Sequence, residues 1–291
     1  MNIRDRLASA GFDRVIALDA RDAGAADHGT LLLGLWTYQA EKQPAQRGAW
    51  IHPYYDASQE AYQAAKSAVE AAQEAGEPCA LRNDIHVKPV FARMPGFTQG
   101  RNTLTYAPGC GSRFHVQIVL TEEVLPTDMQ LERGPHLQHC GDCRRCIDVC
   151  PSHAIDGDGY HRERCLRNWM LSGQSVPEEF RAAMGNRLLG CDECQRCCPH
   201  NPPPEGDSTP AMPLYALLTD PKGMAMQLKN RIGSNMAIPN RVLAQACLLA
   251  GAQRDHALLP AIDRLRDHPS PLVSDHAAWA YGQLSSMEES P

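Results

Sequence analysis

The chain has 291 residues, of which 43% are hydrophobic and 21% are charged, and its formal net charge is −6. This composition excludes a disordered chain, and the length allows more than one domain. No stretch approaches the roughly 18 apolar residues of a membrane span, and the N-terminus lacks a secretory pattern. We therefore expect a cytoplasmic protein with no membrane partner. The negative charge gives no general electrostatic reason to bind nucleic acid.

Residues 1–133 are predicted to form an α/β domain, because short apolar runs alternate with helical patterns. Helices are expected over 3–10 and 58–75, and in the second of these Ala61, Ala65, Val69 and Ala72 share one face. Strands are expected over four segments, 15–18, 30–36, 87–91 and 114–120.

Two further regions follow. Residues 134–206 hold two dense cysteine clusters, which predict a ferredoxin-like double-cluster module. Residues 207–291 are predicted to be helical, with short amphipathic helices over 241–251, 256–267 and 272–284. Helix pairs of this size resemble a HEAT-type repeat. One or two repeats are too few for a solenoid, so we expect a HEAT-like helical cap that covers an exposed surface.

The strongest local signal is the spacing of the first cysteine cluster. Cys140, Cys143, Cys146 and Cys150 are followed by Pro151, which is the C-x2-C-x2-C-x3-C-P run of two-cluster ferredoxins. In this pattern three thiolates bind one [4Fe–4S] cluster, and the cysteine before proline binds the other. With no export signal, twelve cysteines indicate metal binding or catalysis and not disulfides.

Two [4Fe–4S] clusters require eight thiolates. The first run supplies four and Cys165 supplies a fifth. Three more come from the second cysteine group, which comprises Cys191, Cys194, Cys197 and Cys198. The first cluster is assigned to Cys140, Cys143, Cys146 and Cys198. The second is assigned to Cys150, Cys165, Cys191 and Cys194. This leaves Cys197 spare, and the rival assignment uses Cys197 in place of Cys198 or of Cys165.

Structural zinc is the alternative for these cysteines, since C-x2-C pairs are a common zinc motif. Zinc takes four ligands per site and does not require the longer run, so iron–sulfur clusters are favoured. Cys79, Cys110 and Cys247 lack spaced partners, and we expect them to be ordinary core or surface thiols.

The cysteine-rich region, with its flanking segments, resembles the epoxyqueuosine reductase family, with this chain as a shortened and divergent member. The resemblance is carried by the first cysteine run with Pro151, then by Arg164-Cys165 and by residues 176–181 and 185–187. It continues through 190–195 and through Cys198-Pro199-His200-Asn201. Weaker likeness extends upstream over 100–104 and 111–114, and downstream to residues 276–280.

The resemblance implies a cobalamin-dependent enzyme whose first domain binds the corrinoid beside the first cluster. Electrons then pass through both clusters to cobalt, and a carboxylic acid protonates the departing epoxide oxygen. The resemblance places the cofactor contacts at Arg101, Asn102 and Ser112. At the position of the family's acid this chain has His86, with Asp84 two residues before it; on a strand the two side chains would face the same side.

Three functions stay open at this point. The leading one is a corrinoid-linked reductase of epoxyqueuosine in tRNA, or of a related substrate, supplied by a ferredoxin- or flavodoxin-type electron donor. The second is a non-catalytic electron-transfer protein, favoured by His86 in place of the acid. The third is a reductase of a substrate unrelated to tRNA, favoured by the nearly neutral charge of residues 133–193.

Overall fold

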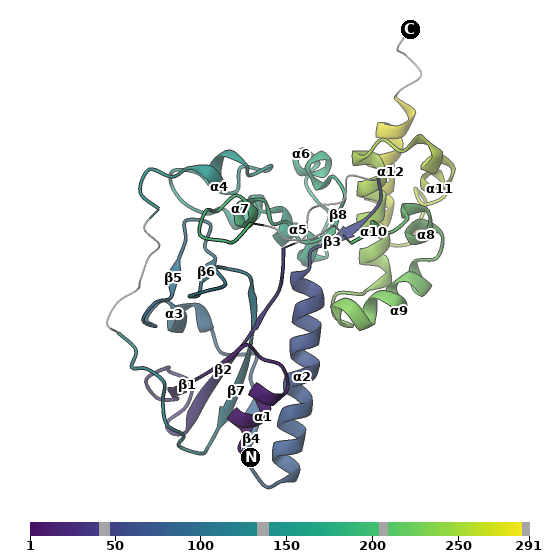
Figure 1. Cartoon of the computed structure of the whole chain (residues 1–291). Coiled ribbons are helices and arrows are strands. Elements are labelled where there is room, and N and C mark those ends of the chain that lie inside the picture. The colour runs from purple at the N-terminus through teal and green to yellow at the C-terminus, as the bar shows by residue number, and fades with distance from the viewer. Residues whose placement is uncertain (41–46, 133–139, 204–208, 287–291) are drawn as a thin grey trace. The chain divides into compact units, whose positions relative to one another are not determined.

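A computed structural model describes residues 1–40, 47–132, 140–203 and 209–286 (Figure 1). The chain divides into two compact units, each assembled from separated segments. The first unit comprises Met1–Ala40, Asp56–Arg145 and Gln195–Pro203. The second comprises Glu41–Tyr55, Cys146–Cys194 and Pro204–Pro291. Within the described residues, no helix is both long enough and apolar enough to span a membrane.

The first unit is built on a four-stranded sheet in the order β1-β2-β7-β4, with every neighbouring pair antiparallel. The strands are β1 (Arg14–Asp19), β2 (Thr30–Thr37), β4 (Cys79–Leu81) and β7 (Phe114–Thr121). Three of the four predicted strands are therefore confirmed. Because the sheet is antiparallel, the domain is of the α+β type and contains no parallel βαβ unit in its main sheet.

Each face of this sheet carries its own apolar core. On one face, α1 (Ile3–Ser9) and α2 (Tyr54–Glu74) cover the strands, and the predicted helix face of Ala61, Ala65, Val69 and Ala72 is buried there. On the other face, Phe91, Met94 and Phe97 pack against alternate residues of β2. Successive side chains of β2 point to opposite cores, which explains why Leu31, Leu32 and Leu33 are all apolar and buried.

The fourth predicted strand is wrong. Val87–Phe91 forms the short helix α3, and His86 is its N-cap residue with an extended backbone. Pro89 lies in the first turn of α3, where a proline needs no amide hydrogen-bond partner. The argument that Asp84 and His86 face one side of a strand therefore fails. The unit is completed by the small hairpin of β5 (Thr98–Gln99) and β6 (Thr105–Tyr106).

The second unit joins most of the cysteine-rich region to the C-terminal helices. Its helices include α5 (Leu166–Ser172), α6 (Glu178–Arg181), α8 (Leu214–Thr219), α9 (Pro221–Ile232), α10 (Pro239–Ala252), α11 (Leu259–Asp263) and α12 (Pro271–Ser285). Three short 3-10 helices, at Arg162–Arg164, Ala182–Met184 and His256–Leu258, connect them. One apolar core links α5, β8 and the C-terminal helices.

The C-terminal helices are confirmed as helices, with α10 buried along most of its length. Their description as a HEAT-like cap stays a prediction. A two-stranded parallel pair, β3 (Trp50–Ile51) with β8 (Arg187–Leu189), was not predicted. β3 belongs to the second unit together with β8. The segments on either side, Met1–Ala40 and Asp56–Arg145, belong to the first unit. The short helices α4 (Arg145–Asp148) and α7 (Glu193–Arg196) each carry cysteines.

Candidate iron–sulfur site

The second unit brings five cysteines together, namely Cys194 and four others around it. Burial raises the pKa of the Cys194 thiol well above its ordinary value, and the next causes are the thiols of four other cysteines. These neighbours are Cys191, Cys165, Cys150 and Cys146. Three of them, with Cys194 itself, are the residues that the sequence assigns to the second cluster. The fold therefore gathers that set from three separate segments of chain.

Amide and hydroxyl groups are directed at the sulfurs of this group. The backbone N–H of Ala154 donates a hydrogen bond to Cys150 Sγ at 3.2 Å. Burial raises the pKa of Cys191 to about 12, while Arg187 and the backbone amide of Glu193 act in the opposite direction. The Tyr160 hydroxyl is hydrogen-bonded to the Cys165 side chain, and its pKa is raised chiefly by burial. Hydrogen bonds to sulfur are a main determinant of iron–sulfur potentials.

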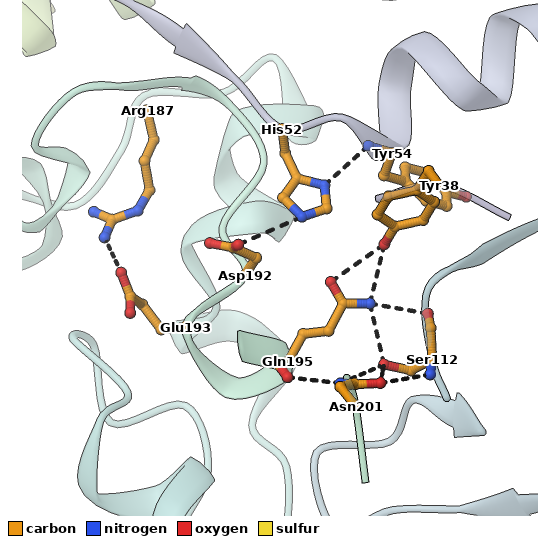
Figure 2. Close-up of polar contacts among 9 residues, drawn as sticks. All are labelled: Tyr38, His52, Tyr54, Ser112, Arg187, Asp192, Glu193, Gln195 and Asn201. Carbon is orange, nitrogen blue, oxygen red and sulfur yellow. Dashed lines mark hydrogen bonds and ion pairs between the residues drawn. The ribbon is translucent and has the colours of Figure 1, made fainter. Parts of the chain in front are cut away.

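The loop between Cys191 and Cys194 is held by charged contacts (Figure 2). The guanidinium of Arg187 forms an ion pair with Glu193. Buried His52 accepts a hydrogen bond from Tyr54 N on its Nδ1, at 3.2 Å, and its Nε2 lies 3.6 Å from the carboxylate of buried Asp192. These contacts fix the backbone on which the two thiols stand.

In the first unit, four side chains anchor the segment that carries Cys197 and Cys198 (Figure 2). The Asn201 side chain accepts a hydrogen bond from Ser112 N at 2.7 Å and donates one to Gln195 O at 2.7 Å. Gln195 Nε2 donates to Ser112 O at 2.9 Å and also contacts the Tyr38 hydroxyl. Ser112, a predicted cofactor contact, is thus one of the residues that position this segment.

A glycine is required beside this network. Gly111 has a φ of +62°, and a Cβ atom there would lie 2.7 Å from His200 O. Any larger residue at position 111 would push the 195–201 segment away from the sheet domain.

Arg101 holds the loop that carries the first cysteines of the run. Its Nη1 donates to Cys143 O at 2.6 Å, and its Nη2 donates to Gly141 O at 3.2 Å. Asn102 is buried, and its side-chain amide donates to the Tyr106 hydroxyl at 3.0 Å. The side chains of all three predicted cofactor contacts are therefore hydrogen-bonded to other residues of the chain. Two of them, Arg101 and Ser112, position segments that carry cysteines.

The predicted catalytic residues lie on the loop before α3. Asp84 is exposed and accepts two hydrogen bonds from Arg82, at 2.8 and 2.6 Å. This pairing with Arg82 lowers the pKa of Asp84 to about 2. His86 is exposed, and its side chain forms no hydrogen bond that caps α3. The two residues share a loop, but only Asp84 is fixed by a charged partner.

The remaining cysteines divide between the core and a surface hollow. Cys79 and Cys247 are buried in apolar clusters, as predicted. Cys110 is partly buried and lines a hollow in the first unit.

Of the ligands assigned to the first cluster, Cys140, Cys143 and Cys198 belong to the first unit, and Cys146 belongs to the second. Sequence reasoning assigned no role to Tyr160 or Gln195, because neither residue type is specific for such a site.

Within the described residues, no three His, Cys, Asp or Glu side chains are grouped as they would be around a single metal ion. A four-iron cluster spreads its thiolates over separate iron atoms, whereas one zinc ion draws four ligands to a common centre.

Comparisons with known proteins agree with the cysteine pattern. Residues 139–201 match the family described as the 4Fe-4S double cluster binding domain. The epoxyqueuosine reductase of Bacillus anthracis is 30% identical over 196 residues, which cover 64% of this chain and 50% of that protein. The Escherichia coli epoxyqueuosine reductase is 32% identical over 204 residues, covering 63% and 50% respectively. The chain thus spans about half the length of the curated relatives that it matches.

Solved structures show the same fold over nearly the whole chain. Epoxyqueuosine reductase from Streptococcus thermophilus aligns with a TM-score of 0.73 and 21% identity, covering 97% of this chain and 89% of that one. An epoxyqueuosine reductase in complex with an epoxyqueuosine-modified tRNA-Tyr stem loop aligns with a TM-score of 0.70 and 20% identity, over the same shares. The predicted resemblance to epoxyqueuosine reductases is confirmed, as is a mixed α/β fold with a double-cluster domain.

Proposed function

We propose that this protein is an iron–sulfur oxidoreductase of the epoxyqueuosine reductase type, which reduces epoxyqueuosine in tRNA or a related substrate. The observation that carries the proposal is the set of thiols around Cys194, within a region that matches a double-cluster domain. Bound [4Fe–4S] clusters would supply one-electron transfer at this site. The electron donor in this proposal is a ferredoxin or flavodoxin in the cytoplasm.

The chain's own residues fit two clusters. For the second cluster, Cys150, Cys165, Cys191 and Cys194 supply the thiolates, and the amide of Ala154 and the hydroxyl of Tyr160 supply hydrogen bonds to sulfur. For the first cluster, Arg101 and the Asn201 network hold the loops that carry the assigned cysteines. These contacts preorganise the ligands, so that little backbone ordering is left to cluster binding.

A cobalamin-type cofactor is part of the proposal because of the resemblance alone. Arg101, Asn102 and Ser112 do not fit the role of direct corrinoid contacts, since their side chains bind the protein's own carbonyl, hydroxyl and amide groups. We therefore assign them to positioning and derive no chemical step through the corrinoid.

For the proton donor, His86 fits better than Asp84. A general acid must hold its proton near the working pH, and the Arg82 pairing keeps Asp84 ionised. The imidazole of His86 is exposed, and its ring nitrogens are able to donate a proton to a bound substrate. The low pKa of Asp84 also favours the second candidate, an electron carrier without a catalytic acid.

One assay separates these functions. The cluster-loaded protein is incubated with reductant, cobalamin and a tRNA stem loop that contains epoxyqueuosine, and queuosine is measured by mass spectrometry. We expect multiple turnovers, retained by Asp84→Asn and reduced at least about tenfold by His86→Ala. No turnover by the intact protein would favour the electron carrier, and turnover of a small molecule but not of the stem loop would favour a substrate unrelated to tRNA.

A further inference from the structure

Arg187 lies against the loop that carries two of the cysteines assigned to the second cluster. It is the first residue of β8, and Cys191 follows two residues after that strand ends. Its guanidinium forms an ion pair with Glu193, which stands between Cys191 and Cys194 in the sequence (Figure 2). The ion pair therefore holds the guanidinium beside the 191–194 loop.

The guanidinium of Arg187 is buried, and its plane is fixed. The side chain is 11% exposed, and its Nη1 donates to Ala183 O at 3.1 Å while its Nη2 binds the Glu193 carboxylate. The backbone is held as well, since Gln245 Nε2 donates to Arg187 O at 3.0 Å. Because a guanidinium is planar, these contacts also set the direction of its Nε–H bond.

This Nε–H group is a buried donor without an acceptor. The Nε atom of Arg187 forms no hydrogen bond with any residue that the structure describes. Buried N–H groups of folded proteins are nearly always paired, because a buried donor that lacks an acceptor costs free energy of folding. A donor in this state fits an acceptor that a bound cofactor supplies.

Sulfur is the acceptor that the surroundings of this donor indicate. Burial raises the pKa of the Cys191 thiol, and Arg187 is the strongest of the groups that act in the opposite direction. A paired cation acts on a buried thiol in this way only from a short distance. The charge of Arg187 is balanced by Glu193, so the Nε–H group, and not net positive charge, distinguishes this site.

We propose that the Nε–H group of Arg187 donates a hydrogen bond to a sulfur atom of the second cluster beside Cys191, and that this bond raises the reduction potential of the cluster. Reduction adds negative charge to the sulfur atoms, so a cationic donor binds the reduced state more strongly. This role rests on the proposed function, which assigns Cys191 and Cys194 to that cluster. It names a residue that sets how readily the cluster accepts an electron.

The test uses the full cluster-loaded chain, prepared anaerobically with arginine that carries ¹⁵N at Nε. The clusters are reduced with dithionite, and pulsed EPR records the coupling of their electron spin to nearby nitrogen nuclei. We expect a ¹⁵N coupling in the wild-type chain and its loss in Arg187→Lys. Lysine keeps the positive charge but places a methylene group where Nε stands.

Arg167→Lys is the matched control. Arg167 follows the assigned ligand Cys165 by two residues, and its Nε already donates to the Tyr55 hydroxyl at 3.2 Å. This variant should keep the coupling. Absence of the coupling from the wild-type chain, or its retention in Arg187→Lys, overturns the proposal. If Arg187→Lys binds less iron than the wild-type chain, the control decides: a coupling kept in Arg167→Lys supports the assignment, and one lost there contradicts it.

An EPR-monitored redox titration gives a readout that a purely structural role would not move. At a fixed solution potential, the ratio of reduced to oxidised second cluster should fall about tenfold in Arg187→Lys, which is about 59 mV for a one-electron couple. Arg167→Lys should change this ratio less than about twofold. Equal shifts in the two variants, at full iron content, contradict the proposal.

Iron content separates failure of this role from failure of the proposed function. A chain that binds no iron–sulfur cluster under anaerobic conditions refutes the function itself. A chain with about eight iron atoms but no ¹⁵N coupling leaves the function standing and refutes only the role of Arg187.

Discussion

The ring of His276 accepts a hydrogen bond from the backbone amide of Val176 at 3.0 Å. On its other nitrogen it donates to Ala244 O at 3.1 Å, so a neutral imidazole joins α12, α10 and the segment between the two cysteine groups. Arg181 reinforces this junction by donating to Val176 O and pairing with Asp275. The second unit is therefore fastened by a histidine that must stay unprotonated.

This junction predicts that stability is lost in mild acid. The pKa of His276 is lowered to about 4, chiefly by burial, whereas an unfolded histidine has a pKa of about 6.5. The unfolded chain thus binds the proton first, and the free energy of unfolding falls as the pH drops from about 6.5 towards 4. We expect a loss of about 2 kcal/mol between pH 7.5 and 5 from this residue.

Urea unfolding of the chain at both pH values measures this loss, with His276→Gln as the matched variant. Glutamine offers an acceptor and a donor but does not titrate, so the two proteins share every other pH effect. The intact chain should lose more stability than the variant over this interval. Equal losses would show that His276 does not control acid stability.

Replacement of Arg101 should weaken one cluster selectively. Arg101→Gln removes two charge-assisted hydrogen bonds to Gly141 O and Cys143 O, each worth about 1.5–3 kcal/mol. We expect iron to fall from about eight towards about four per chain during anaerobic dilution, because only the first cluster depends on this loop. Lys66→Gln, an exposed charge change on α2, should keep the full iron content.

The adjacent cysteines 197 and 198 separate the two ligand assignments. In the favoured assignment, Cys198→Ser removes a ligand of the first cluster and Cys197→Ser removes none. Iron and sulfide analysis should give about eight iron atoms for Cys197→Ser and about four for Cys198→Ser. The reverse pattern supports the rival assignment with Cys197 as the ligand.

The Tyr160 hydroxyl should raise the reduction potential of the second cluster. A hydrogen bond to Cys165 stabilises the more negative, reduced cluster, so Tyr160→Phe should lower the potential by an amount on the order of tens of millivolts. An EPR-monitored redox titration measures the shift. Tyr215→Phe, which removes an exposed hydroxyl on α8, serves as the control and should leave the potential unchanged.

Sequence reasoning found the features that repeat along the chain. Residues 114–120 alternate clearly enough to identify β7, and the alanine face of α2 is visible at helical spacing. The cysteine spacing predicted a double-cluster domain, and residues 139–201 match the family model of one. These signals are local, so they are readable without knowledge of the tertiary structure.

The features that were missed or wrong depend on non-local contacts or on very short segments. Val87–Phe91 is apolar and only five residues long, and at that length periodicity does not separate strand from helix. The parallel pairing of Trp50 with Arg187 joins residues far apart in the chain. Likewise, the contacts of Arg101 with Gly141 and of Ser112 with Asn201 were missed, because nothing in the sequence shows that these residues lie side by side.

The most direct test of the account is made on protein prepared anaerobically. Iron and sulfide are counted, and the EPR spectrum of cob(II)alamin is recorded with and without the protein. A reductase of the proposed type should contain about eight iron atoms per chain and should change the cobalt signal. The same iron content with an unchanged cobalt signal would contradict the corrinoid-linked reductase and leave a two-cluster electron carrier.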